Sequence, residues 1–115
     1  MPGEPFQVTG CAGTAPGVHI LSVRGAINQA TSPAFDEAVH AAHAQHLIID
    51  LSGVPSIDSM AIGALVRVFV SCNKSGRKLA LVGLSHHVKN VLRLTGVEAL
   101  FETYPTIPEA EAAAG

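Results

Sequence analysis

Basic residues are scarce in this sequence, and their scarcity argues against one class of function. Among the 115 residues, seven Lys and Arg stand against nine Asp and Glu, giving a formal net charge of −2 at pH 7. A protein that binds a phosphate backbone normally presents a basic face, and seven scattered cations do not form one. We therefore do not expect nucleic acid among its partners.

Long apolar runs and targeting signals are also missing. The longest apolar stretch, Ala61 to Cys72, is interrupted by Arg67 and Ser71, whereas a membrane helix needs about 18 uninterrupted apolar residues. Residues 1–5 lack the basic segment that precedes the apolar run of a signal peptide. These observations predict a cytoplasmic protein that does not insert into a membrane.

Charged residues and cysteines are few as well. Only 14% of residues are charged and 48% are hydrophobic, which excludes a wholly disordered chain and suits one small domain. The two cysteines, Cys11 and Cys72, lie far from any cluster of metal-ligating residues, and without an export signal we expect two free thiols.

The pattern of apolar residues predicts alternating strands and helices. Residues 1–17 form a loosely patterned segment with a short edge strand at 6–8, and a single domain follows over 18–115. We expect strands at 18–24, 47–51, 79–83 and 100–104, and helices at 33–43, 58–74, 86–95 and 107–114. Ser32 and Ser85 are the expected caps of two helices, and Gly76 and Gly96 the terminators of two. This order indicates an α/β domain with a mainly parallel, mixed sheet, an N-terminal hairpin and about four helices.

The richest segment lies between the 47–51 strand and the helix that follows it. Residues 47–65 read LIIDLSGVPSIDSMAIGAL, so that Asp58 and Ser59 stand at a junction between strand and helix. Free amide groups and the positive end of the helix dipole favour an anion there. A phosphate on Ser59 would be stabilised locally while changing the charge of a docking surface. From spacing alone, the simpler interpretation is that Asp58 or Ser59 merely caps the helix.

This segment resembles the STAS family, named for sulfate transporters and anti-sigma-factor antagonists. The match includes Asp-Leu-Ser-Gly at 50–53, Val-Pro-Ser-Ile-Asp-Ser at 54–59 and Gly-Ala-Leu at 63–65, and later blocks at 76–83 and 91–97 extend it. The resemblance implies a STAS domain that acts as an anti-sigma factor antagonist. It would bind an anti-sigma factor that is a serine kinase, which would phosphorylate Ser59 and end the binding, and a phosphatase would reset the protein.

The resemblance also assigns the candidate site. Ser59 is the expected phosphorylation site, and Ser56, Asp58, Ser59 and Met60 are the expected partner-binding residues, with Ser56 as the second choice of acceptor. Met60 and Ala61 depart from the family pattern, which has a small polar residue and then Gly. Met60 adds apolar bulk beside the acceptor, and Ala61 restricts a backbone that Gly would leave free.

Other functions are less well supported. His40, His43 and His46 recur every three residues, but no Cys or carboxylate completes a metal site around them. No Walker A loop, G-x-G-x-x-G or G-x-S-x-G motif is present, so we expect neither a cofactor nor catalytic residues, and no enzyme.

Two further expectations concern partners. An open N-terminal sheet edge could pair with a second copy and make a homodimer. The alternative function is a constitutive scaffold, or an accessory subunit of a signalling complex or a lipid-transport ATPase. The resemblance implies this alternative because lone STAS domains also look like subunits of such assemblies. In that case Met60 would belong to a permanent apolar contact.

Overall fold

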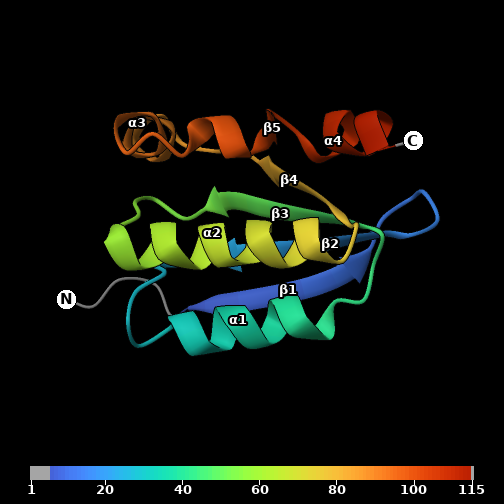
Figure 1. Cartoon of the computed structure of the whole chain (residues 1–115), viewed down its shortest axis with the longest axis horizontal. Coiled ribbons are helices and arrows are strands. Elements are labelled where there is room, and N and C mark those ends of the chain that lie inside the picture. Colours follow the sequence, from blue (N-terminus) through green and yellow to red (C-terminus); the bar gives the residue numbers. More distant parts are fainter. Residues whose placement is uncertain (1–5, 115) are drawn as a thin grey trace.

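The computed structural model describes residues 6–114, which form a five-stranded sheet flanked by four helices (Figure 1). The strands follow one another across the sheet in chain order, β1 to β5. β1 pairs with β2 antiparallel, and every later neighbouring pair is parallel. The predicted α/β class and the N-terminal hairpin are confirmed. The strands are β1 (Gln7–Ala12), β2 (Val18–Arg24), β3 (His46–Gly53), β4 (Lys78–Val82) and β5 (Glu102–Tyr104), and the helices are α1 (Ser32–Ala41), α2 (Ser59–Lys74), α3 (His86–Leu94) and α4 (Ile107–Ala114), with a short 3-10 turn at Glu98–Leu100.

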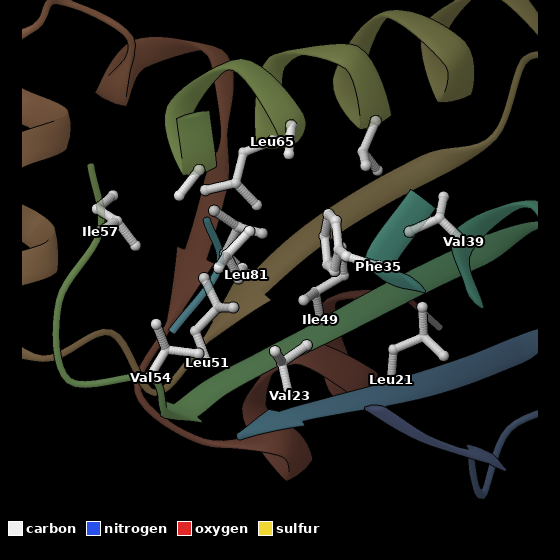
Figure 2. Close-up of a cluster of buried hydrophobic side chains, with 14 of the residues drawn as sticks. Leu21, Val23, Phe35, Val39, Ile49, Leu51, Val54, Ile57, Leu65 and Leu81 are labelled. Atoms are coloured by element: carbon white, nitrogen blue, oxygen red, sulfur yellow. The ribbon is translucent and has the colours of Figure 1, made fainter. Parts of the chain in front are cut away.

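The larger core lies between the sheet and helices α1, α2 and α3. Alternate residues of the strands point to it, because side chains along a strand alternate between the two faces. Phe35 of α1, Leu65 of α2 and Ile49 of β3 are all fully buried in this cluster (Figure 2). A smaller cluster on the opposite face joins α4, through Ala110, to Val18, Ile20, Ile48 and Val82. The sheet is therefore covered on both faces around β3, as the nearly continuous apolar run of that strand predicts.

The N-terminal strand is longer than the sequence pattern predicts. We expected an edge strand at 6–8 followed by turns, whereas β1 extends to Ala12 and pairs along its whole length with β2. The backbone hydrogen bonds of a hairpin do not require an alternating apolar pattern, and this explains why the pattern missed residues 9–12. The expectation for residues 1–5 lies outside the described part of the chain.

Ser32 does not cap α1, contrary to our prediction. The cap position belongs to Thr31, and Ser32 is the first residue of the helix, with only 5% of its surface exposed. Its hydroxyl accepts a hydrogen bond of 3.1 Å from Arg67 of α2, which also donates to Asp36 at 3.2 Å. Ser32 therefore joins α1 to α2, a role that depends on a residue 35 positions away. The helix ends at Ala41, two residues before the predicted end.

The later elements follow the prediction closely. Ser85 caps α3 by accepting from the backbone N–H of Val88 at 3.1 Å. Gly76 and Gly96 follow α2 and α3 with φ of 71° and 78°, the left-handed conformation expected of terminators. These residues mark the start of α3 and the ends of α2 and α3.

Candidate functional site

The loop between β3 and α2 is held down at both ends by buried side chains. Val54 is fully buried and Ile57 is 7% exposed, and both join the larger core (Figure 2). Ile57 also forms a parallel backbone bridge with Ile27. Pro55 and Ser56, which lie between these two buried residues, are exposed. The loop is thus pinned to the core while its polar residues face solvent.

Asp58 and Ser59 occupy two distinct positions at the start of α2. Asp58 is the N-cap, in extended conformation, and its carboxylate accepts a hydrogen bond of 3.0 Å from the backbone N–H of Ala61. Ser59 is the first helical residue and its side chain is exposed. The cap is therefore supplied by Asp58, which leaves the hydroxyl of Ser59 free of that task. Among residues 6–114, the N–H groups of Ser59 and Met60 have no hydrogen-bond acceptor.

The two residues that depart from the family pattern, Met60 and Ala61, differ in burial. Met60 is 41% exposed, one of the few large apolar side chains at the surface of the described residues. Ala61 is fully buried in the core below the helix start. Its methyl group fills space in the interior, and its N–H receives the cap. Met60 alone, therefore, changes the surface beside Ser59.

A second loop, which the sequence motif does not include, lies next to this site. The hydroxyl of Ser85, at the start of α3, lies 3.5 Å from the carbonyl oxygen of Pro55. Figure 1 shows α2 and α3 starting at the same end of the sheet. The exposed side chains of His86 and His87 follow Ser85 directly. The parallel β3–β4 pair could have indicated this arrangement, because the carboxyl ends of parallel strands meet at one edge of the sheet.

Behind both loops, Asp50 of β3 lies beside Gly83, which follows the last residue of β4. The carboxylate of Asp50 accepts from the N–H of Ser52 at 2.9 Å. Gly83 has a φ of 70°, and a Cβ there would lie 2.9 Å from Cβ of Ser52 and 3.1 Å from the Asp50 carboxylate. Glycine is thus required by both conformation and space, and it lets the two strand ends approach each other.

The four predicted site residues lie in one continuous segment. Ser56, Asp58, Ser59 and Met60 are all exposed, and Asp58 contributes a negative charge next to the Ser59 hydroxyl. Within residues 6–114, no group of three or more His, Cys, Asp or Glu side chains is arranged to hold a metal ion. Nor does any helix in that part of the chain have the length and apolar character needed to cross a membrane. The arrangement offers a solvent-facing hydroxyl on a rigid support, at a surface that can contact another protein.

Comparisons with known proteins agree with this fold and extend it. The family profile described as STAS domain matches residues 12–110. A Thermotoga maritima protein, named as a candidate anti-sigma factor antagonist, is 37% identical over 76 residues, and the match covers 66% of this chain and 66% of that protein. The match thus spans just under two-thirds of the relative's length.

Solved structures show the same likeness over nearly the whole chain. The crystal structure of an anti-sigma factor antagonist from Mycobacterium paratuberculosis is 28% identical, with a TM-score of 0.79 and 93% of each chain covered. The structure of the murine Solute Carrier 26 family member A9 anion transporter is 27% identical with a TM-score of 0.76, covering 87% of this chain but 18% of the transporter. The fold therefore occurs both in antagonists of about this size and as a small part of a much larger protein.

Proposed function

Because this chain belongs to the STAS domain family and its relatives include proteins named as anti-sigma factor antagonists, we propose that it is itself such an antagonist. In this proposal it acts in the cytoplasm, binds an anti-sigma factor that is a serine kinase, and thereby frees a sigma factor to direct transcription. Phosphorylation of Ser59 ends the binding. The chain is a substrate of the kinase and not an enzyme.

One observation carries the proposal: the hydroxyl of Ser59 is exposed at the first position of a 16-residue helix whose cap is supplied by its neighbour. A kinase can reach such a hydroxyl without unfolding the domain. Ser56, the other exposed serine of the segment, lies in the loop before Ile57 and is not on the helix. The support of a helix N-terminus is thus available to a phosphate on Ser59.

The proposed switch follows from charge. The kinase would transfer the γ-phosphoryl group of ATP to Oγ of Ser59, releasing ADP and the hydroxyl proton, and a phosphatase would hydrolyse the ester. The phosphate adds a charge of about −2, beside the carboxylate of Asp58. The helix dipole and the free N–H groups offset this charge within the domain. A partner that has packed against a neutral hydroxyl has no such compensation, and it dissociates.

The proposed docking surface combines the two loops at this end of the sheet. It includes Ser56, Asp58, Ser59 and Met60, together with His86 and His87 of the adjoining α3. Met60 supplies apolar area that a partner can bury, which stabilises a complex by roughly 25 cal/mol for each Å² removed from water. The polar residues around it would set orientation.

A binding experiment with matched variants tests the proposal. We expect Ser59→Asp to weaken binding to the cognate kinase by tenfold or more while the melting temperature changes little, because the added carboxylate lies at a helix N-terminus. Asn73→Asp is the control, because it adds the same charge at an exposed position near the opposite end of α2, outside the docking surface, and it should leave the affinity nearly unchanged. Mass spectrometry after incubation with kinase and ATP should locate the phosphate on Ser59, and modification that persists undiminished in Ser59→Ala would reject the assignment.

The same binding experiment, together with affinity purification from lysate, distinguishes the switched antagonist from the constitutive scaffold or accessory subunit. A constitutive scaffold would bind its partner equally well as wild type and as Ser59→Asp, and it would lose affinity in Met60→Ser. Recovery of a transport ATPase, with no kinase-like anti-sigma factor, would support that function instead.

A further inference from the structure

The outer edge of β1 is open, and its free backbone groups can be assigned from the register. The N–H of Gly13 donates to the carbonyl of Val18 at 2.8 Å, and this pair continues the β1–β2 register beyond Ala12 and His19. In an antiparallel ladder, hydrogen-bonded positions alternate with free ones. Counting back from Gly13, the residues that direct their N–H and C=O away from β2 are Val8, Gly10 and Ala12.

The exposure of these residues agrees with an uncovered edge. Gly10 has no side chain, so its exposed surface belongs to its backbone, and Ala12 is exposed as well. Val8 is half-buried against the larger core, and α1 runs alongside β1 (Figure 1). Among residues 6–114, no segment supplies a hydrogen-bond partner to the outer side of any of the three. Six residues of strand are thus available for pairing.

The edge also lacks the features that normally prevent association. Natural proteins protect edge strands with charged side chains, prolines or bulges. β1 reads QVTGCA, which contains no charge and no proline, and its register with β2 is regular throughout. The strand is therefore suited to pair with another strand, and nothing within it repels an identical one.

We propose that two copies of this chain associate through β1, antiparallel about a two-fold axis at Gly10, so that two five-stranded sheets become one. This register uses all three free positions: Gly10 pairs with Gly10 of the second copy, and Val8 pairs with Ala12. This inference stands independently of the proposed function, because it rests on β1 and not on the loop that carries Ser59.

Charged residues near the two ends of β1 favour antiparallel pairing with a second copy. Arg24 lies opposite Gln7, at the beginning of β1. At the other end, the carboxylate of Glu111 in α4 accepts from the hydroxyl of Thr14 at 3.0 Å. Ile20 of β2 faces α4, and Arg24, four residues later on the same strand, lies on that same face of the sheet. Antiparallel pairing brings the Arg24 end of one copy next to the Glu111 end of the other on the same face of the sheet, so opposite charges meet.

Cysteine cross-linking tests both the dimer and its register. In the proposed register, Thr9 lies opposite Cys11 of the second copy at a free, closely spaced position with Cα atoms about 4.5 Å apart, a separation that a disulfide spans. Thr9→Cys should therefore form two disulfides per dimer when oxidised glutathione is added. Each disulfide releases two thiol protons and passes two electrons to one oxidised glutathione, which becomes two glutathione molecules.

Matched variants make each outcome decisive. In wild type the two Cys11 Cα atoms would lie about 7–8 Å apart, diagonally across the dyad, so we expect no cross-link, and likewise none in Thr9→Cys/Cys11→Ser. A cross-link in wild type or in that double variant would show another register and overturn the assignment at Gly10. Absence of a cross-link in Thr9→Cys would overturn it too.

Sedimentation of the full-length protein measures the association without any cross-link. A short edge buries little area, so we expect a dimer that forms at high micromolar concentration. Ala12→Pro removes only an outward N–H, which an edge strand tolerates, and should weaken the dimer about tenfold or more. Ala12→Ser keeps the N–H and should leave it intact. A monomer at all concentrations up to about 500 µM, where association as weak as that of the smallest interfaces would still be seen, would refute the proposal.

Discussion

The same chemical change, glycine to alanine, should have opposite effects at two positions of this protein. Gly63 lies inside α2, and the atom nearest to an added Cβ is Nη1 of Arg67 at 3.7 Å, an ordinary contact. Gly96 follows α3 with a φ of 78°, and an added Cβ would meet nothing within 4 Å. Packing is therefore almost neutral at both sites, and backbone conformation decides the sign.

The magnitudes follow from the two conformations. In a helix interior, Ala is favoured over Gly by about 0.8–1.0 kcal/mol, so Gly63→Ala should raise the free energy of unfolding by about that amount. In the left-handed region an L-residue costs about 1–2 kcal/mol, so Gly96→Ala should lower it correspondingly. For a chain of this size, 1 kcal/mol shifts the melting temperature by about 4–6 °C.

Thermal and urea denaturation of the two variants and wild type would measure the difference. Gly76→Ala provides an independent repeat of the second case, because Gly76 has a φ of 71° and equally open surroundings. The reasoning would be refuted if Gly63→Ala were destabilising, or if Gly96→Ala and Gly76→Ala matched wild type. Either result would mean that contacts other than those of the isolated domain determine stability at these positions.

Five other substitutions probe the cap, the core and a buried thiol. Asp58→Ala removes the acceptor for the Ala61 N–H and should lower stability by about 1 kcal/mol, whereas Asp58→Asn keeps an acceptor and should be close to neutral by thermal melting. Phe35→Ala, at a fully buried position, should cost about 3–5 kcal/mol in urea denaturation, and Leu94→Ala, at a position 74% exposed, should cost less than about 0.5 kcal/mol. Burial raises the pKa of the Cys72 thiol above its ordinary value of 9.0, and the nearby Arg77 only partly opposes this. As the pH rises, the unfolded chain therefore loses this proton before the folded chain does. The stability that the buried thiol contributes is fully present below about pH 8.5. The stability advantage of wild type over Cys72→Ala should then narrow as the pH rises from 8 to 10, and an advantage that stays constant or widens would contradict the assignment.

Most of the fold could be predicted because its signals are local. The caps at Asp58 and Ser85 and the terminators at Gly76 and Gly96 each act within one turn of a helix, and the structure has all four in place. The exceptions depend on distant residues. Ser32 is a preferred cap by type, but Arg67 binds its hydroxyl inside the α1–α2 contact. Similarly, residues 9–12 are strand because β2 lies beside them.

The sequence could predict which residues form the candidate site, but not which other parts of the chain lie next to it. The motif located Asp58 and Ser59, and by residue type either one could be the N-cap of the helix. Only the structure assigns the cap to Asp58 and shows Ser59 exposed. The sequence predicted Ser85 as a cap but not its closeness to this site, because 27 positions separate the first residues of the two helices, Ser59 of α2 and His86 of α3. Their proximity is a property of the parallel sheet.

The bridge between Ile57 and Ile27, together with the burial of Val54, constrains how any modifying enzyme can engage this protein. Many kinases thread an extended peptide through their active sites. The proposed acceptor hydroxyl, that of Ser59, is fixed at the end of a preformed helix, and the preceding loop cannot be drawn out without breaking the core. Recognition would have to read the folded surface, so a synthetic fragment with the same amino acids should be a poor substrate.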